Sequence, residues 1–211
     1  AEEIDLRKIY DSILAGDPSG KTITFTIASG IKIVAQYALL DLVVLPAIFI
    51  GVWPSSTVLS LVINGEVYGA GGLGASRSFI INNKAQHGLP AISNFKSEVT
   101  IDGLVITEST NFITIINNGI LGGGGGGGGG GGFESAGGQG GYTNDDTLGL
   151  DGFNGGGLGG DVGQNGQAGT SADPHPDGGT WGDAGLAAGA IAMPATQFLF
   201  VNNGTLIGNI T

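Results

Sequence analysis

The sequence predicts a mainly β protein with a short N-terminal α-helix and a packed array of glycine-rich helices of the polyproline-II type. Three observations support this prediction. Residues 122–132 are eleven consecutive glycines, and 31 of the 44 glycines lie between positions 119 and 189. Residues 22–28 alternate between polar and apolar side chains, which is typical of a strand. Short apolar runs that end in Asn-Gly or Asn-Asn recur on both sides of the glycine block.

A run of eleven glycines makes a poor helix or strand, because glycine loses more backbone freedom on folding than any other residue. It is therefore either a flexible linker or a segment held in a conformation that only glycine can pack into. Aromatic residues among the glycines, and strand signals before and after them, favour the packed segment. A polyproline-II helix has no internal hydrogen bonds, so neighbouring glycine segments would have to bond one another sideways. Collagen is excluded, because the chain has seven prolines and no strict three-residue glycine period.

The charge is distributed unevenly along the chain, which has a formal net charge of −11. Residues 1–97 carry seven basic and seven acidic side chains, whereas no Lys or Arg follows Lys96 and eleven acidic residues do. This distribution excludes nucleic-acid binding by the second half, which the phosphate backbone would repel. The chain has no cysteine, so neither disulfides nor thiolate metal sites support the fold.

The N-terminal part raises two questions of location. The start lacks the charged and apolar regions of a signal peptide, and Ala1 is compatible with a removed initiator methionine or with a fragment. The apolar stretch Ile33–Trp53 is long enough to suggest a membrane span. Gln36, Asp41 and Pro46 interrupt this stretch, so we expect buried strands there and no membrane insertion.

The first expected element is a helix over Glu2–Leu14, with an apolar face and three acidic residues in its first turn. The Gly- and Pro-containing residues 16–20 end it. Such a helix either packs on its own domain or docks into a partner or a fibre shaft.

Strands are expected after the helix. Thr22–Ala28 gives the clearest signal, and Ile31–Gln36, Leu39–Leu45 and Ala47–Trp53 follow. The apolar-run motif then appears at residues 61–69, 79–84, 99–105, 113–119 and 198–208. Because Asn-Gly and Asp-Gly are strong turn signals, these strands form hairpins or solenoid-like rungs. The chain would leave a β platform, run out and back through glycine segments, and return to the platform.

We expect three inserts, at residues 133–136, 142–153 and 170–183, to form the far turns of the glycine scaffold. Aromatic side chains on a rigid scaffold bring large contact area at low entropy cost, as a binding surface requires. The candidate contact residues are Phe133, Tyr142, Asn144, Asp145, Asp146, Phe153, Pro174, His175, Pro176, Asp177 and Trp181. The candidate scaffold glycines are Gly122, Gly127, Gly132, Gly156 and Gly160.

The sequence lacks the catalytic and cofactor-binding motifs of common enzyme classes. A phosphate-binding loop needs a lysine that the glycine block lacks, and His87 and His175 do not have zinc-hydrolase spacing. No nucleophile elbow is present. Thr143–Gly149 resembles part of a calcium-binding Gly/Asp repeat, but the nine-residue period is missing. We expect no enzyme activity, no cofactor and no metal, although a single cation bridging loop carboxylates stays open.

The passage from residues 116–119 (Ile-Asn-Asn-Gly) into the glycine run, followed by Gly155–Gln164 and Gly182–Ile191, resembles phage tail-fibre tip adhesins. The chain is similar over residues 60–211 to the distal receptor-recognising proteins of T-even-type phages and to glycine-rich tips of some central tail fibres. The resemblance implies a polyglycine-II sandwich at the virion tail tip, whose loops bind an outer-membrane protein or a surface glycan of the host. It also implies that residues 1–57 attach to a tail-fibre or tail-tip protein and that residues 58–211 bind the receptor. The alternatives are a structural glycine-rich element without a receptor role and a calcium-binding repeat protein.

Overall fold

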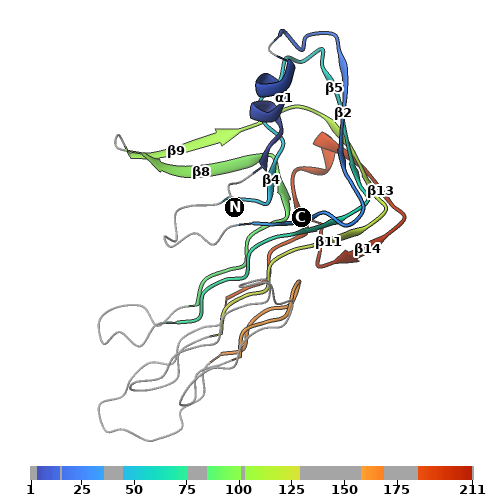
Figure 1. Ribbon diagram of the computed structural model, residues 1–211. Coiled ribbons are helices and arrows are strands. Elements are labelled where there is room, and N and C mark those ends of the chain that lie inside the picture. The colour runs from blue at the N-terminus through green and yellow to red at the C-terminus, as the bar shows by residue number, and fades with distance from the viewer. Residues whose placement is uncertain are drawn as a thin grey trace, which may run out of the picture.

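The computed structural model describes residues 4–14, 16–35, 45–75, 85–100, 103–128, 158–168 and 185–210. Within these ranges strands dominate and one short α-helix lies near the N-terminus, which confirms the predicted fold class at this level. Figure 1 shows a β platform from which the glycine-rich segments extend in one direction. The platform determines where each of these segments starts and ends.

In the described ranges, three four-stranded sheets form the platform, and each takes its strands in chain order. The first sheet contains β1 (Ile4–Asp5), β4 (Ile48–Phe49), β7 (Ile92–Ser93) and β12 (Ile191–Ala192). The second sheet contains β2 (Thr22–Ile27), β5 (Val58–Ile63), β10 (Ile113–Asn117) and β13 (Phe198–Asn202). The third sheet contains β3 (Lys32–Val34), β6 (Glu66–Tyr68), β11 (Ile120–Gly122) and β14 (Thr205–Ile207). A 3-10 turn, Ala195–Gln197, precedes β13.

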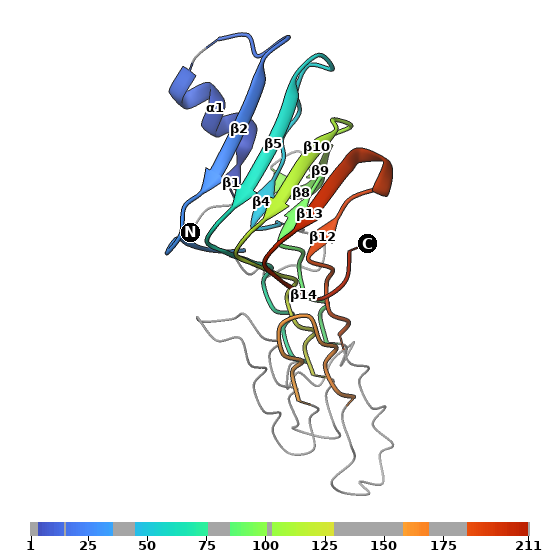
Figure 2. The same cartoon turned by 90° about the vertical axis from the view of Figure 1, so that its right-hand side faces the viewer.

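Every strand pair in these three sheets is parallel. The chain therefore visits the three sheets in turn, and each circuit, which we call a rung, stacks on the one before. Rung 1 contains β1 to β3, rung 2 contains β4 to β6, rung 3 contains β7, β10 and β11, and rung 4 contains β12 to β14. Figure 2 shows β2, β5, β10 and β13 side by side in this order. The sequence left hairpins and solenoid-like rungs open, and the motifs at residues 61–69, 113–119 and 198–208 form rungs.

The Asn-Gly steps form the corners between the second and third sheets. Asn118 Nδ2 donates a hydrogen bond to Asn64 Oδ1 (2.9 Å), and Asn203 Nδ2 donates one to Asn118 Oδ1 (3.0 Å). These asparagines form a ladder that runs across rungs 2 to 4. Gly119 comes directly after Asn118 of the ladder. A Cβ at this position would fall on the carbonyl oxygen of Gly65 in the rung below, so a side chain does not fit there. The same dipeptide that favours a tight hairpin thus also suits the corner of closely stacked rungs.

A hairpin of antiparallel strands, β8 (Phe95–Thr100) and β9 (Gly103–Glu108), is inserted in rung 3 and projects from the platform (Figure 1). Here the Asp-Gly signal does mark a hairpin, and Gly103 has a φ of 120°, in the region that favours glycine. Near the base of the hairpin, Lys96 Nζ lies 3.5 Å from Asp5 Oδ2, and both side chains are buried. This ion pair links the hairpin to the first strand of the chain.

The core of the solenoid is formed by the inward-facing, alternate residues of its strands. Leu59 and Leu61 of β5 are fully buried, and so are Ile113 and Ile115 of β10. In the strand register, Ile115 lies between Leu61 on one side and Phe200 of β13 on the other. Full burial of such a side chain stabilises the fold by about 1.5–3 kcal/mol. Apolar stacking from rung to rung therefore holds the platform together.

The helix α1 (Leu6–Leu14) begins later than the expected position 2, because Ile4 and Asp5 pair with β4 as a strand. The Asp5 carboxylate then caps the helix. Its Oδ1 accepts hydrogen bonds from the backbone N–H groups of Arg7 (3.0 Å) and Lys8 (3.2 Å). These donors have no partner within the helix, so the cap stabilises its first turn.

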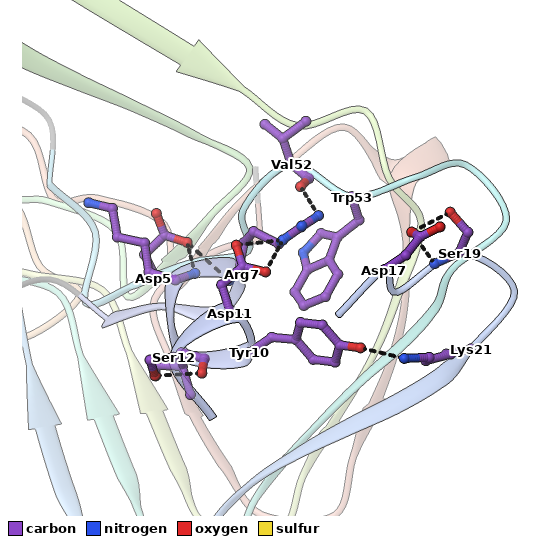
Figure 3. Close-up of polar contacts among 12 residues, drawn as sticks. Asp5, Arg7, Tyr10, Asp11, Ser12, Asp17, Ser19, Lys21, Val52 and Trp53 are labelled. Carbon is purple, nitrogen blue, oxygen red and sulfur yellow. Dashed lines mark hydrogen bonds and ion pairs between the residues drawn. The ribbon is translucent and has the colours of Figure 1, made fainter. Parts of the chain in front are cut away.

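Aromatic contacts attach α1 to its own domain (Figure 3). The Tyr10 ring lies edge-on to Trp53 at 5.4 Å, and Trp53 lies 5.9 Å from Phe25 of β2. The Arg7 guanidinium lies 5.4 Å from the centre of the Trp53 ring. Lys21 Nζ donates a hydrogen bond to the Tyr10 hydroxyl (3.0 Å). The helix thereby covers the rung 1 end of the solenoid, beside β2 (Figure 2).

The strands expected over residues 22–28, 31–36 and 47–53 are observed in shorter form as β2, β3 and β4. The strand expected over 39–45 falls outside the described residues apart from its last position, and the motif at 79–84 falls wholly outside them. No helix in the described ranges has the length and apolar character needed to span a membrane.

Candidate functional site

The glycine-rich segments leave the third sheet at the end of one rung and return to the first sheet at the start of the next. The segment after β6 runs out over residues 69–75 and returns over 85–91, before β7. The segment after β11 runs out over 123–128, reappears at 158–168, and returns over 185–190, before β12. The two excursions therefore start on adjacent rungs and extend side by side (Figure 1).

Residues 122–128 of the long glycine run form hydrogen bonds with several neighbouring segments. Every third carbonyl oxygen accepts a hydrogen bond from the segment 69–75. These bonds join Gly122 to Gly69 (2.9 Å), Gly125 to Gly72 (2.7 Å) and Gly128 to Ala75 (3.0 Å). The hydrogen bonds between these two segments therefore recur every three residues along each of them.

The residues in between face other segments. The N–H of Gly124 donates to the Leu89 carbonyl (3.0 Å), and its own carbonyl accepts from the Ala188 N–H (3.0 Å). Three residues on, Gly127 donates to Gln86 (3.0 Å) and accepts from Gly185 (2.8 Å). Positions 123 and 126 face the segment 158–168, where Gly163 and Gly160 donate to their carbonyl oxygens at 2.9 and 2.8 Å. The long run is thus surrounded, and successive residues bond in different directions.

Missing side chains make this close packing possible. A Cβ at Gly124 would fall on the carbonyl oxygen of Ala70, and one at Gly127 would fall on that of Leu73. Gly160 is restricted in the same way by the Gln164 carbonyl. In each case the obstacle is backbone that is itself hydrogen bonded, so it cannot move aside as a flexible side chain would.

The structure describes three of the five predicted scaffold glycines. Gly127 and Gly160 lie in closely packed glycine segments, as stated above. Gly122 differs, because it belongs to β11 and a Cβ there would meet the side chains of Val162 (2.8 Å) and Tyr68 (3.0 Å). Gly132 and Gly156 lie outside the described residues.

All candidate contact residues lie outside the described residues, in the ranges 129–157 and 169–184. These residues are Phe133, Tyr142, Asn144, Asp145, Asp146, Phe153, Pro174, His175, Pro176, Asp177 and Trp181. The described segments 158–168 and 185–190 flank the last insert, residues 170–183. Gly166 donates a hydrogen bond to the Gly185 carbonyl (3.0 Å), so the last insert begins and ends beside paired backbone.

Sequence reasoning missed a polar hollow at the rung 4 side of the glycine segments. It has a volume of about 230 Å³ and is lined by Gly163, Asn165, Ala187, Ala188, Gly189 and Asn209. Asn165 Oδ1 accepts a hydrogen bond from the Ala187 N–H (2.7 Å), which joins two glycine segments. No sequence pattern marks these asparagines, because they come together only through packing.

The described part of the site does not place metal-ligating groups together. Among these residues, no group of three His, Cys, Asp or Glu side chains could hold a metal ion. His87 has a structural contact, because its Nδ1 accepts a hydrogen bond from the Leu186 N–H (2.8 Å). The sequence Thr143–Gly149, considered above for calcium, lies outside the described residues.

The described residues thus combine a stacked β platform with closely bonded glycine-rich segments. The chain matches, over residues 1–211, the family model described as phage tail fibre adhesin Gp38, and it therefore belongs to this family. It is an adhesin of the virion tail tip and not an enzyme, and membership of the family implies receptor binding. No curated protein and no solved structure matches the chain.

Proposed function

We propose that the protein attaches a phage to its host through loops at the far end of the glycine segments. The receptor would be an outer-membrane protein or a surface glycan of the bacterium. The observation that supports this proposal most directly is the path of the chain. The excursions from the platform run out and back through closely bonded glycine segments, and the aromatic inserts of the sequence fall between the outward and returning parts.

The described glycine segments are proposed to be helices of the polyglycine-II type. The three-residue recurrence of bonded neighbours supports this proposal, because a polyproline-II helix has three residues per turn and all its backbone groups point sideways. Such a scaffold is stiff, since each segment is bonded to several others. A stiff scaffold presents its loops with little loss of entropy on binding.

The proposed contact residues combine aromatic, proline and acidic side chains. Trp181 and Tyr142 supply large contact area, and the Asp173–Asp177 segment contains two prolines that restrict its backbone. No basic residue follows Lys96, so the receptor surface would be neutral or positively charged.

Attachment to the phage is proposed to use residues 1–57, with residues 58–211 bearing the receptor-binding part. Two side chains at the end of α1 support this proposal. Ile13 and Leu14 are 71 % and 63 % exposed, whereas Leu6 and Tyr10 of the same helix are buried. Adjacent exposed apolar side chains on a helix that already covers one end of the solenoid would fit a fibre or tail-tip protein.

Deletion of residues 173–181 tests the receptor-binding proposal. We expect adsorption of the purified protein to host cells to fall strongly while circular dichroism stays unchanged. Leu186→Ala is a matched control, because Leu186 is exposed on a glycine segment next to the same insert but lies outside it. Full adsorption by a folded deletion variant would exclude this loop from the receptor contact.

A further inference from the structure

We propose that the open edge of β13 binds an extended, uncharged segment of the phage's own fibre protein as an additional parallel strand. This proposal rests on the proposed attachment of the chain to the fibre, and it adds a second contact surface for the same partner. The surface lies at the rung 4 end of the solenoid, opposite the end that α1 covers (Figure 2).

Among the described residues, β13 is the edge strand of the second sheet and pairs only with β10. The N–H of Asn203, just after the strand, donates to the Asn117 carbonyl (2.7 Å). Because backbone groups alternate in direction along a strand, those of Phe200 and Asn202 point away from β10. An edge of this kind is a template for another strand.

The two ends of the solenoid differ in how their edge strands are protected. At the rung 1 edge, Lys21 precedes β2, Lys32 begins β3, and the outward side chains of β2 are threonines. Lysines and an adjacent covering helix are common means of preventing edge-to-edge pairing. Among the described residues, the rung 4 edge has neither a lysine nor a covering helix. Leu199 and Val201 of β13 are 53 % and 39 % exposed, and residues 185–211 contain no charged side chain.

The rung 4 end also continues the stacking pattern of the solenoid. The asparagine ladder ends at Asn203, which is exposed. In the first sheet, the chain's own Ile210 forms a parallel bridge with Ile191 of β12. A fifth layer has therefore begun in that sheet, whereas no residue in the described ranges pairs with the outer edge of β13 in the second sheet.

The chemistry of the edge defines its occupant. A charged strand would lose hydration without gaining a counter-charge, so the segment must be uncharged, with apolar or β-branched side chains beside Leu199 and Val201. A carboxamide at its corner would extend the ladder beyond Asn203. The edge belongs to the platform, whereas the glycine segments carry the chain away from it (Figure 1). This position favours the fibre over the host receptor.

Thiol protection tests the proposal directly, because the chain has no cysteine and one introduced thiol is a unique label site. Val201→Cys and Thr24→Cys place the thiol on the outward face of β13 and on that of the opposite edge strand, β2. Each purified variant is labelled with a maleimide, alone and in complex with the co-expressed fibre protein. We expect the complex to slow labelling at position 201 by about tenfold or more and to leave position 24 unchanged.

A binding measurement complements this test. Leu199→Lys introduces a lysine at the edge, and Thr24→Lys introduces one at the same row of the sheet on the other edge. We expect Leu199→Lys to weaken fibre binding by about tenfold and Thr24→Lys to have no effect, with equal thermal unfolding of the two variants.

Several results would overturn the proposal. If the wild-type chain binds the fibre protein but position 201 stays fully reactive, the edge is not the contact and the proposed N-terminal attachment stands. Protection that appears in the chain alone and rises with its concentration would assign the edge to a second copy. Protection only on host cells would assign it to a host protein. If the wild-type chain fails to bind the fibre protein, the proposed attachment itself fails.

Discussion

The strands of the platform and the glycine segments beyond them satisfy the backbone in different ways. A strand such as β10 bonds to two neighbours in one plane, β5 and β13, and stacks alternate side chains in the core. The glycine run 122–128 bonds to the segments 69–75, 85–89, 158–168 and 185–188, and it has no side chains to bury. Loss of the side chain therefore increases the number of neighbours that one backbone can have, while apolar stacking is given up.

This difference has an energetic consequence. Each backbone hydrogen bond contributes about 1 kcal/mol net, whereas a buried aliphatic side chain contributes about 1.5–3 kcal/mol. The platform can thus lose a hydrogen bond and keep its core, but the glycine segments depend on close approach alone. Added side-chain volume should therefore destabilise the glycine segments, and removed side-chain volume should destabilise the platform.

The largest effect is expected from Gly124→Ala. The new Cβ would fall on the Ala70 carbonyl, which belongs to hydrogen-bonded backbone, so we expect a loss of about 4 kcal/mol or more in the free energy of unfolding. Denaturant unfolding measures this change. Gly16→Ala is the control, because the nearest atom to a Cβ there, apart from its chain neighbours, lies at 3.4 Å and a change below about 1 kcal/mol is expected. Equal stability of the two variants would contradict the close packing described here.

A smaller effect is expected from Leu61→Ala in the core of the solenoid. The cavity should lower the free energy of unfolding by about 3 kcal/mol and weaken all rungs together. Hydrogen exchange in β5 and β10 would report the change. Ser60→Ala, on the other face of the same strand, should change the free energy of unfolding by less than about 0.5 kcal/mol. If Leu61→Ala were as mild as Ser60→Ala, apolar stacking would not be what holds the platform.

The smallest effect concerns Tyr68, at the junction of the two regions. Burial, with the nearby Glu66 carboxylate as a second cause, raises the pKa of Tyr68 from 10.0 to about 12. The unfolded chain would therefore ionise first, so the stability contributed by the neutral side chain is present below pH 10 and is lost as the pH rises to about 12. We expect this alkaline loss in the wild type and not in Tyr68→Phe. Parallel pH profiles of unfolding for the two proteins would refute it.

The sequence predicted the fold class because its signals are local. Alternation in residues 22–27 identified β2, and the Asn-Gly steps marked the positions where the chain turns. The local sequence could not distinguish hairpins from rungs, because a solenoid corner and a hairpin need the same small, flexible residues. Of the two-residue strands β1, β4, β7 and β12, only β4 lies within a predicted strand, at residues 47–53. Strands this short have no periodicity to recognise, so the other three became visible only in the structure.

The candidate site was predicted less completely. The sequence indicated that glycines would pack against glycines, and Gly160 and Gly185 donate hydrogen bonds to the carbonyl oxygens of Gly126 and Gly127. Which segments would be neighbours was not predictable, because a residue without a side chain carries no information about its partner. The buried pair of Lys96 and Asp5 was missed for a related reason, since 91 residues separate two side chains that only the stacked rungs bring together.

The hydrogen-bonding partner of the glycine tract changes with a period of three residues. Residues 122, 125 and 128 bond to one neighbouring segment, and the residues between them bond to other segments. Removal of three glycines would shorten the tract, and every remaining residue would still face the segment to which it bonds now. Removal of one glycine would turn each following N–H group toward a different segment. Changes of length in such a tract should therefore be tolerated in multiples of three, so that the tip can lengthen or shorten while the rungs beneath it stay the same.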